Sequence, residues 1–75
     1  MRQRDRVKKY MEDFGEISSF EAYKELGITQ LGARIWELKN KDGIEIGERW
    51  EADKNRYGEP ISYKVYNIKE VNNGR

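Results

Sequence analysis

The apolar residues at the start of the chain recur with helical spacing. The positions i, i+3, i+4 and i+7 predict a helix over about residues 2–14, with a buried face formed by Val7, Tyr10, Met11 and Phe14. Gly15 is expected to end this helix, because glycine readily adopts the left-handed conformation found there. The residues from Glu16 to Ser18 predict either a strand of a single rung or a simple link.

A second helix is predicted directly afterwards. Ser18 and Glu21 have the spacing of a capping box, so this helix is expected to begin at Ser18 or Ser19. Gly27 is expected to end it. Its predicted buried face consists of Phe20, Tyr23 and Leu26, with Ala22 beside them.

A third helix follows after a very short connection. Thr29 is the predicted N-cap, the helix is expected to end near Lys41, and its buried positions are Leu31, Ile35 and Leu38. Helices joined this tightly cross at a large angle, and we expect Ile28 to fill the corner between them. This arrangement is a helix-turn-helix, and it leaves the start of the third helix protruding.

From Ile44 the period of the pattern changes from helical to two. One face of the first predicted strand carries Ile44, Ile46, Glu48 and Trp50, and a polar stretch over residues 52–60 separates it from a second strand over about 61–68. Asn55 and Gly58 are expected to have positive φ in the turn region. The prediction is an α+β winged helix-turn-helix, in which three helices precede a two-stranded hairpin. The sequence does not decide whether a third short strand is present. Residues 1–75 form one domain with a core over about 4–68 and a flexible tail over 71–75.

Composition narrows the classes of function. The chain contains no cysteine and no histidine, which excludes disulfides, thiolate or imidazole metal ligands, and Cys- or His-based catalysis. No carboxylate pair or glycine-rich phosphate loop stands out, and no apolar run is long enough to span a membrane. We therefore expect a cytoplasmic protein that is not an enzyme and binds no cofactor and no metal.

The net charge of +1 conceals an alternation along the chain. Residues 1–11 carry +4, residues 12–26 carry −4, residues 27–41 carry +2, residues 42–53 carry −4 and residues 54–75 carry +3. The alternation suits a protein with one basic and one acidic face, and a mixed solvated surface is the alternative.

The protruding helix has the size and chemistry for a DNA major groove, which is about 12 Å wide. The candidate contact residues there are Thr29, Gln30, Gly32, Ala33 and Arg34. Gln30 can read adenine, and Arg34 can read guanine or hold a phosphate. Gly32 and Ala33 are small enough to let the helix backbone approach the bases. Trp36 is predicted to pack under the hairpin or against a partner.

The hairpin tip is the second candidate contact. It carries Lys54, Asn55, Arg56 and Tyr57, which suit contact with phosphates or entry into the minor groove. The cations of residues 2–9 either meet a flanking phosphate or form an ordinary solvated helix face. An opposing signal is the acidic first strand, whose carboxylates would repel phosphates if they faced DNA: Glu45, Glu48, Glu51 and Asp53.

Over about residues 4–68 the chain resembles the small winged helix-turn-helix proteins of phages and bacterial mobile elements. The matching residues are Arg6-Val7, Phe20-Glu21-Ala22, Glu25-Leu26-Gly27-Ile28-Thr29, Ala33-Arg34-Ile35, Leu38, Lys54-Asn55-Arg56-Tyr57-Gly58 and Tyr66. The resemblance implies double-stranded DNA binding, a phage or prophage origin, and a role in the control of transcription or recombination.

Two other functions remain open from the sequence. In one, a phage protein uses the winged-helix scaffold to bind and inhibit a host protein, such as a defence nuclease or a polymerase. Its anchors would then be Trp36, Trp50, Tyr57 and Tyr63, which otherwise pack within the domain. In the other, the protein is an architectural factor in recombination. Because one recognition helix reads few base pairs, we expect a homodimer, with an interface in the first helix or the tail.

Overall fold

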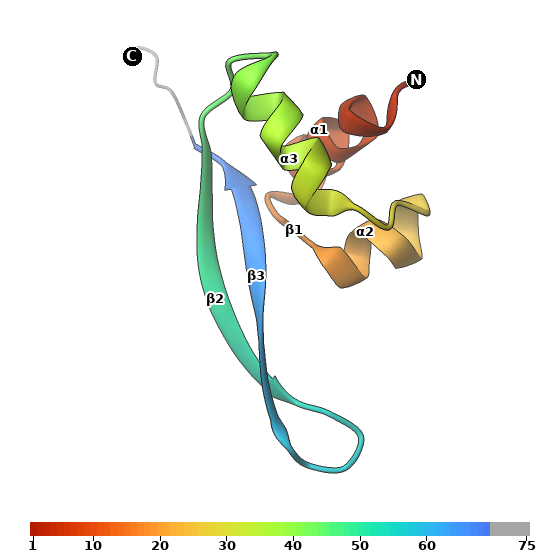
Figure 1. The fold of residues 1–75 in the computed structure, drawn as a ribbon, viewed down its shortest axis with the longest axis vertical. Helices are drawn as coiled ribbons and strands as arrows, with labels where there is room; N and C mark the ends of the chain where they lie inside the picture. The colour runs from red at the N-terminus through yellow and green to blue at the C-terminus, as the bar shows by residue number, and fades with distance from the viewer. Residues whose placement is uncertain (70–75) are drawn as a thin grey trace.

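The computed structural model describes residues 1–69, in which three helices and three strands follow one another along the chain (Figure 1). The elements are α1 (Gln3–Phe14), β1 (Ile17–Ser18), α2 (Ser19–Leu26), α3 (Leu31–Asn40), β2 (Ile46–Lys54) and β3 (Pro60–Ile68). The predicted α+β class, the order of the elements and the third short strand are confirmed. The expected tail over 71–75 lies outside the described residues.

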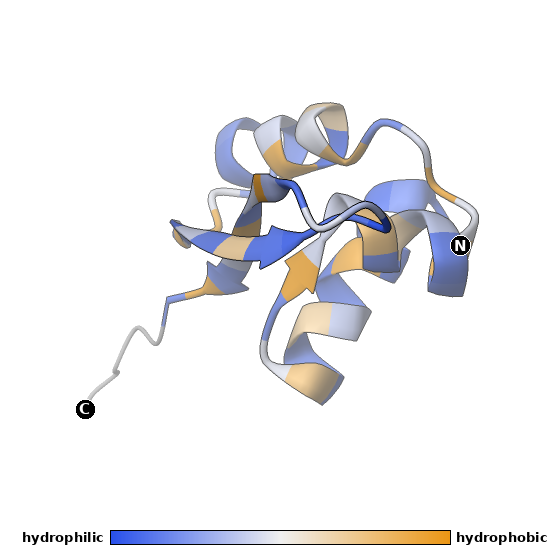
Figure 2. Ribbon diagram, turned by 90° about the horizontal axis from the view of Figure 1, so that it is seen from below, coloured by the Kyte–Doolittle hydropathy of each residue, from blue (hydrophilic) through white to orange (hydrophobic). Residues whose placement is uncertain are grey.

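The strands form one antiparallel sheet in the order β1-β3-β2. The two long strands pair from Ile46 opposite Ile68 to Lys54 opposite Pro60. β1 is much shorter, and pairs only with Tyr66 and Val65. The hairpin of β2 and β3, which we call the wing, therefore projects well beyond the helices (Figure 1). Seen from its tip, its strands carry hydrophilic residues interspersed with hydrophobic ones (Figure 2).

The core is made of aliphatic side chains from all three helices and the base of the sheet. Its buried members are Val7, Met11, Ile17, Ala22, Ile28, Leu31, Ile35, Leu38 and Ile46. The predicted buried positions of α3 are confirmed, as is the place of Ile28, which is 1% exposed in the corner between α2 and α3. This corner fixes the angle at which α3 leaves the body.

The prediction of buried aromatic residues in α1 and α2 holds only for Tyr10, which is half-buried against the core, and is wrong for the other three. Phe14 and Phe20 are each 69% exposed, and Tyr23 is 64% exposed. In α2 the buried residue is Ala22, with Leu26 half-buried beside it. The helix turns its small residue inward because alanine allows its backbone to approach the other elements closely, and the aromatic rings are left on the outside.

The two helix starts differ from each other. The capping box of α2 is confirmed: the Glu21 amide donates to the Ser18 hydroxyl at 3.4 Å, and the Ser18 amide donates to the Glu21 carboxylate at 2.9 Å. The predicted N-cap Thr29 is wrong, because α3 begins at Leu31 with Gln30 as an N-cap that makes no side-chain cap bond. Thr29 instead belongs to the turn, in which Ile28 takes the buried position.

The wing begins later and closes more tightly than predicted. Ile44 precedes β2, and its amide donates to the Leu38 carbonyl at 2.9 Å. This hydrogen bond holds the segment after α3 against the end of the helix. Only residues 55–59 remain as the loop, since the strands extend to Lys54 and from Pro60. Gly58 has the expected positive φ of +80°, but Asn55 does not, and the reason lies in its side chain.

Candidate nucleic-acid interface

The turn before α3 presents the helix to solvent. Gly27 takes the left-handed conformation at φ +70° and ends α2. The amides of Gly27 and Ile28 both donate back, at 3.0 Å, to the carbonyls of Tyr23 and Ala22. The chain thus reverses within a few residues, and one side of the first turn of α3, at Gln30 and Gly32, is exposed.

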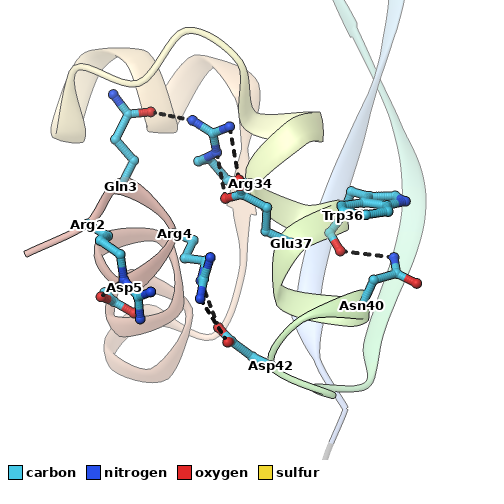
Figure 3. A network of polar contacts seen from close by, with 9 residues as sticks. All are labelled: Arg2, Gln3, Arg4, Asp5, Arg34, Trp36, Glu37, Asn40 and Asp42. Atoms are coloured by element: carbon cyan, nitrogen blue, oxygen red, sulfur yellow. Dashed lines mark hydrogen bonds and ion pairs between the residues drawn. The ribbon is translucent and has the colours of Figure 1, made fainter.

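The exposed side of α3 is a continuous strip. Its members are Gln30, Gly32, Trp36, Lys39 and Asn40, while Ala33, Arg34 and Glu37 are half-buried on the flank. Trp36 is 57% exposed, so the predicted packing under the wing is wrong. The wing diverges from the helices and leaves the indole uncovered. Asn40 donates its side-chain amide to the Trp36 carbonyl at 3.0 Å (Figure 3).

Arg34 points away from this strip, towards α1. Its guanidinium donates to the Gln3 side-chain oxygen at 2.9 Å and forms an ion pair with Glu37 in which Nε and Oε1 are 3.0 Å apart (Figure 3). The side chain is only 25% exposed. A second link, from Arg4 to Asp42 at 3.2 Å, joins α1 to the turn after α3. The predicted contact residue Arg34 therefore already has a role in holding α3 against α1.

The tip of the wing is organised by Asn55. Its side-chain oxygen accepts from the amides of Tyr57 and Glu59 at 2.9 and 3.0 Å, and its Nδ2 donates to the Glu59 carboxylate at 2.8 Å. These bonds form the turn from the side chain, so the backbone of Asn55 keeps a negative φ and only Gly58 is left-handed. Asn55 thus shapes the loop that presents its neighbours.

Those neighbours are exposed. Tyr57 is 81% exposed, and Lys54 and Arg56 are exposed on either side of Asn55. Within residues 1–69, neither cation has a carboxylate close enough for an ion pair. The same holds for Lys39 and Lys41 at the end of α3, which the sequence reasoning passed over. Their position next to the exposed strip could have identified them.

The cations of α1 are different, because carboxylates of the same helix or the neighbouring turn take most of them. Lys8 lies 3.8 Å from Glu12, and Lys9 lies 3.3 Å from Asp13. Arg2 donates to Asp5 at 3.1 Å, and this hydrogen bond lowers the pKa of the Asp5 carboxyl. The basic block at the N-terminus is therefore largely neutralised on its own helix.

The acidic residues of β2 are divided between the two faces of the wing. Glu48 lies 3.2 Å from Lys64, which also stacks over the Trp50 ring at 5.2 Å, all on the face that continues from the core. Glu51 and Asp53 lie on the opposite face, in register with Tyr63 and Ile61. The repulsion expected of an acidic strand thus falls mainly on one side of the wing.

Two classes of site are lacking in the part of the chain that the structure describes. Residues 1–69 bring together no group of three or more carboxylate, histidine or cysteine ligands suited to a metal ion. None of the helices in this range combines the length and apolar character needed to cross a bilayer.

Comparison with known proteins identifies one family. The family described as "Winged helix-turn-helix domain" matches residues 2–71, which is nearly the whole chain. No curated protein and no solved structure matches.

Proposed function

The chain belongs to the winged helix-turn-helix family, and from this premise we propose that it binds double-stranded DNA with sequence specificity. In the proposed complex α3 enters the major groove and the wing tip contacts the backbone or the minor groove. The proposal is of a binding protein and not of an enzyme.

One observation carries the proposal: within residues 1–69, four of the seven exposed cations without an ion partner lie at the two projecting parts of the molecule, and the other three are Arg6, Lys24 and Lys69. Lys39 and Lys41 lie at the end of α3, and Lys54 and Arg56 lie at the wing tip. An unpaired surface cation can neutralise a phosphate and release its counterion, whereas a cation already paired must first lose its carboxylate. The free positive charge is therefore available where the fold projects.

We propose that the exposed start of α3 recognises the DNA sequence. Gln30 can make a bidentate contact with adenine, and Thr29, Gly32 and Ala33 lie close enough to the helix start to meet base edges. Arg34 can take part only if its guanidinium leaves Gln3 or Glu37, which makes it a weaker candidate than Gln30. At the wing tip, Tyr57 is free for contact, and Asn55 acts by holding the loop.

Selection from a pool of duplexes tests the proposal. The purified chain is mixed with short random-sequence duplexes at low salt, the bound fraction is sequenced, and an enriched motif is expected. Fluorescence anisotropy on that motif then measures affinity for Lys39→Ala and Arg56→Ala, with Lys9→Ala as the control. All three variants lose one positive charge, but Lys9 is paired with Asp13. Absence of binding to any duplex at low salt, or equal losses in all three variants, would contradict the proposal.

The biological role that we propose rests on the same DNA binding. We propose a transcriptional regulator of phage or prophage origin that acts in the bacterial cytoplasm as a homodimer on two half-sites, about one helical turn apart. A palindromic motif in the selected pool, together with a mass of two chains per duplex in light scattering, supports this role. A motif without symmetry and one chain per duplex would favour an architectural factor or a monomeric regulator.

A further inference from the structure

A groove lies on the face of the wing that points away from the core. It runs between this face and the start of α2 and has a volume of about 470 Å³. Neither α3 nor the wing-tip loop lines it. The groove is therefore separate from the surface proposed for DNA.

Apolar side chains form much of the groove and remain open to solvent. Ile61 and Tyr63 of β3 are 42% and 38% exposed, and Phe20 of α2 is 69% exposed opposite them. The exposure of Phe20, which contradicted its predicted place in the core, thus creates one side of this groove. Contiguous exposed apolar groups rimmed by polar ones mark interaction sites.

The rim is acidic. Arg49 forms ion pairs with two carboxylates, Glu16 at 2.7 Å and Glu51 at 2.6 Å. Two further carboxylates, Glu21 and Asp53, accept only local backbone amides and have no cation within ion-pair distance in residues 1–69. The groove thus carries four carboxylates against one guanidinium. Such a surface repels phosphates and attracts cationic side chains.

One strand edge beside the groove is uncovered. β1 pairs with Val65 and Tyr66 only, because the chain turns into α2 at Ser19. Over 61–64, β3 therefore has β2 on one side and, among the residues described, no strand on the other. An open edge offers backbone donors and acceptors to an extended chain.

We propose that this groove binds an extended segment of a partner protein that carries lysine or arginine at alternate positions. The segment adds as a strand beside β3, and alternation places all its cations on the groove side. Their aliphatic stems lie on Ile61, Tyr63 and Phe20, and their charged ends reach Glu21 and Asp53. This partner is a protein, and its site is distinct from the surface proposed for DNA.

The probe is a synthetic peptide of alternating lysine and valine, about eight residues long and blocked at both ends. Titration followed by NMR of the amide groups is expected to shift residues 61–64 and the start of α2, with saturation below about 1 mM. A lysine–proline peptide of the same charge is expected not to bind, because proline lacks the backbone donor that strand addition needs. An alternating glutamate–valine peptide is also expected not to bind.

Two neighbouring substitutions provide the matched comparison. Ile61→Lys places a cation inside the groove, and Ser62→Lys places the same cation on the opposite face of the same strand. We expect Ile61→Lys to weaken peptide binding by about tenfold or more and Ser62→Lys to leave it nearly unchanged. Circular dichroism checks that both variants fold.

Four results would overturn the proposal. They are an absence of shifts at the highest peptide concentration, shifts centred on α3 or the wing tip, equal losses in the two variants, and equal binding of the lysine–proline peptide. Duplex binding by Ile61→Lys at the wild-type level supports two separate sites.

Discussion

At the scale of single residues, Gly32 is a position where the needs of stability and of DNA binding differ. It lies on the exposed strip of α3, and a Cβ placed there meets no atom within 4 Å. Glycine inside a helix costs about 0.5–1 kcal/mol relative to alanine. The chain keeps a destabilising residue at a position where its own fold has room for a larger one, which fits a close approach of the helix backbone to a ligand.

Gly32→Ala is therefore expected to act in opposite directions on stability and binding. The free energy of unfolding should rise by up to about 1 kcal/mol, because alanine favours the helix. Affinity for the selected duplex should fall, because the added methyl group holds the helix away from the groove floor. Urea denaturation and fluorescence anisotropy measure the two effects. Wild-type affinity in a stabilised variant would show that the helix backbone does not approach the bases at this position.

A second residue-scale prediction concerns Glu16, whose pKa is lowered from its ordinary value of 4.5 by the hydrogen bond from Arg49. A lowered pKa in the folded state means that the ionised form stabilises the fold. This contribution is complete above the ordinary pKa and is lost as the pH falls through the lower, folded-state value. The stability difference between wild type and Glu16→Gln should therefore be small but present at pH 7, and should disappear in acid.

Thermal unfolding at neutral and acidic pH measures this difference, with Glu12→Gln as the control. Glu12 is a glutamate of α1 that pairs with Lys8 at the longer distance of 3.8 Å. A difference between wild type and Glu16→Gln that stays constant from neutral pH to well below 4.5 would contradict the assigned ion pair.

At the scale of elements, two hydroxyl residues lie before α2 and α3, and only one of them caps its helix. Ser18 closes a reciprocal capping box, whereas Thr29 caps nothing. Ser18→Ala should cost about 1 kcal/mol of unfolding free energy, because an orphan amide of α2 loses its acceptor. Thr29→Ala should leave stability almost unchanged. Urea denaturation of both variants tests the pair, and equal losses would mean that Thr29 supports the turn in some other way.

The elements themselves could largely be predicted from the sequence, because hydrophobic period and glycine placement are local signals. The faces of short helices could not. In α2 the large aromatic residues suggested the buried face, but close packing selected Ala22 instead, and this choice depends on neighbours far away in the sequence. The same limit applies to Arg34, whose partner Gln3 lies 31 residues earlier. Asn55 was misjudged for another reason, since its side chain rather than its backbone makes the turn.

At the scale of the whole molecule, the fold distributes its charge among separate surfaces. The molecule extends over 45 × 28 × 20 Å, with the wing tip and the C-terminal end of α3 at opposite ends in Figure 1. Free cations occupy both of these places, ion pairs take most of the cations of α1, and excess carboxylates line the groove behind the wing. The net charge of +1 is therefore a poor guide to what the protein binds.

This separation predicts that the two cationic regions contribute independently to DNA binding. Sites with no shared partners and a wide separation give additive free-energy changes. Each phosphate contact contributes about 0.9 to the slope of log affinity against log salt concentration. Lys39→Ala and Arg56→Ala should each reduce that slope by about 1, and the double variant should reduce it by about 2. Anisotropy titrations over a range of salt concentrations measure the slopes, with Lys9→Ala expected to match wild type. A double variant no weaker than one of the singles would mean that α3 and the wing do not contact the duplex at the same time, and the wing would then have to be assigned to another partner.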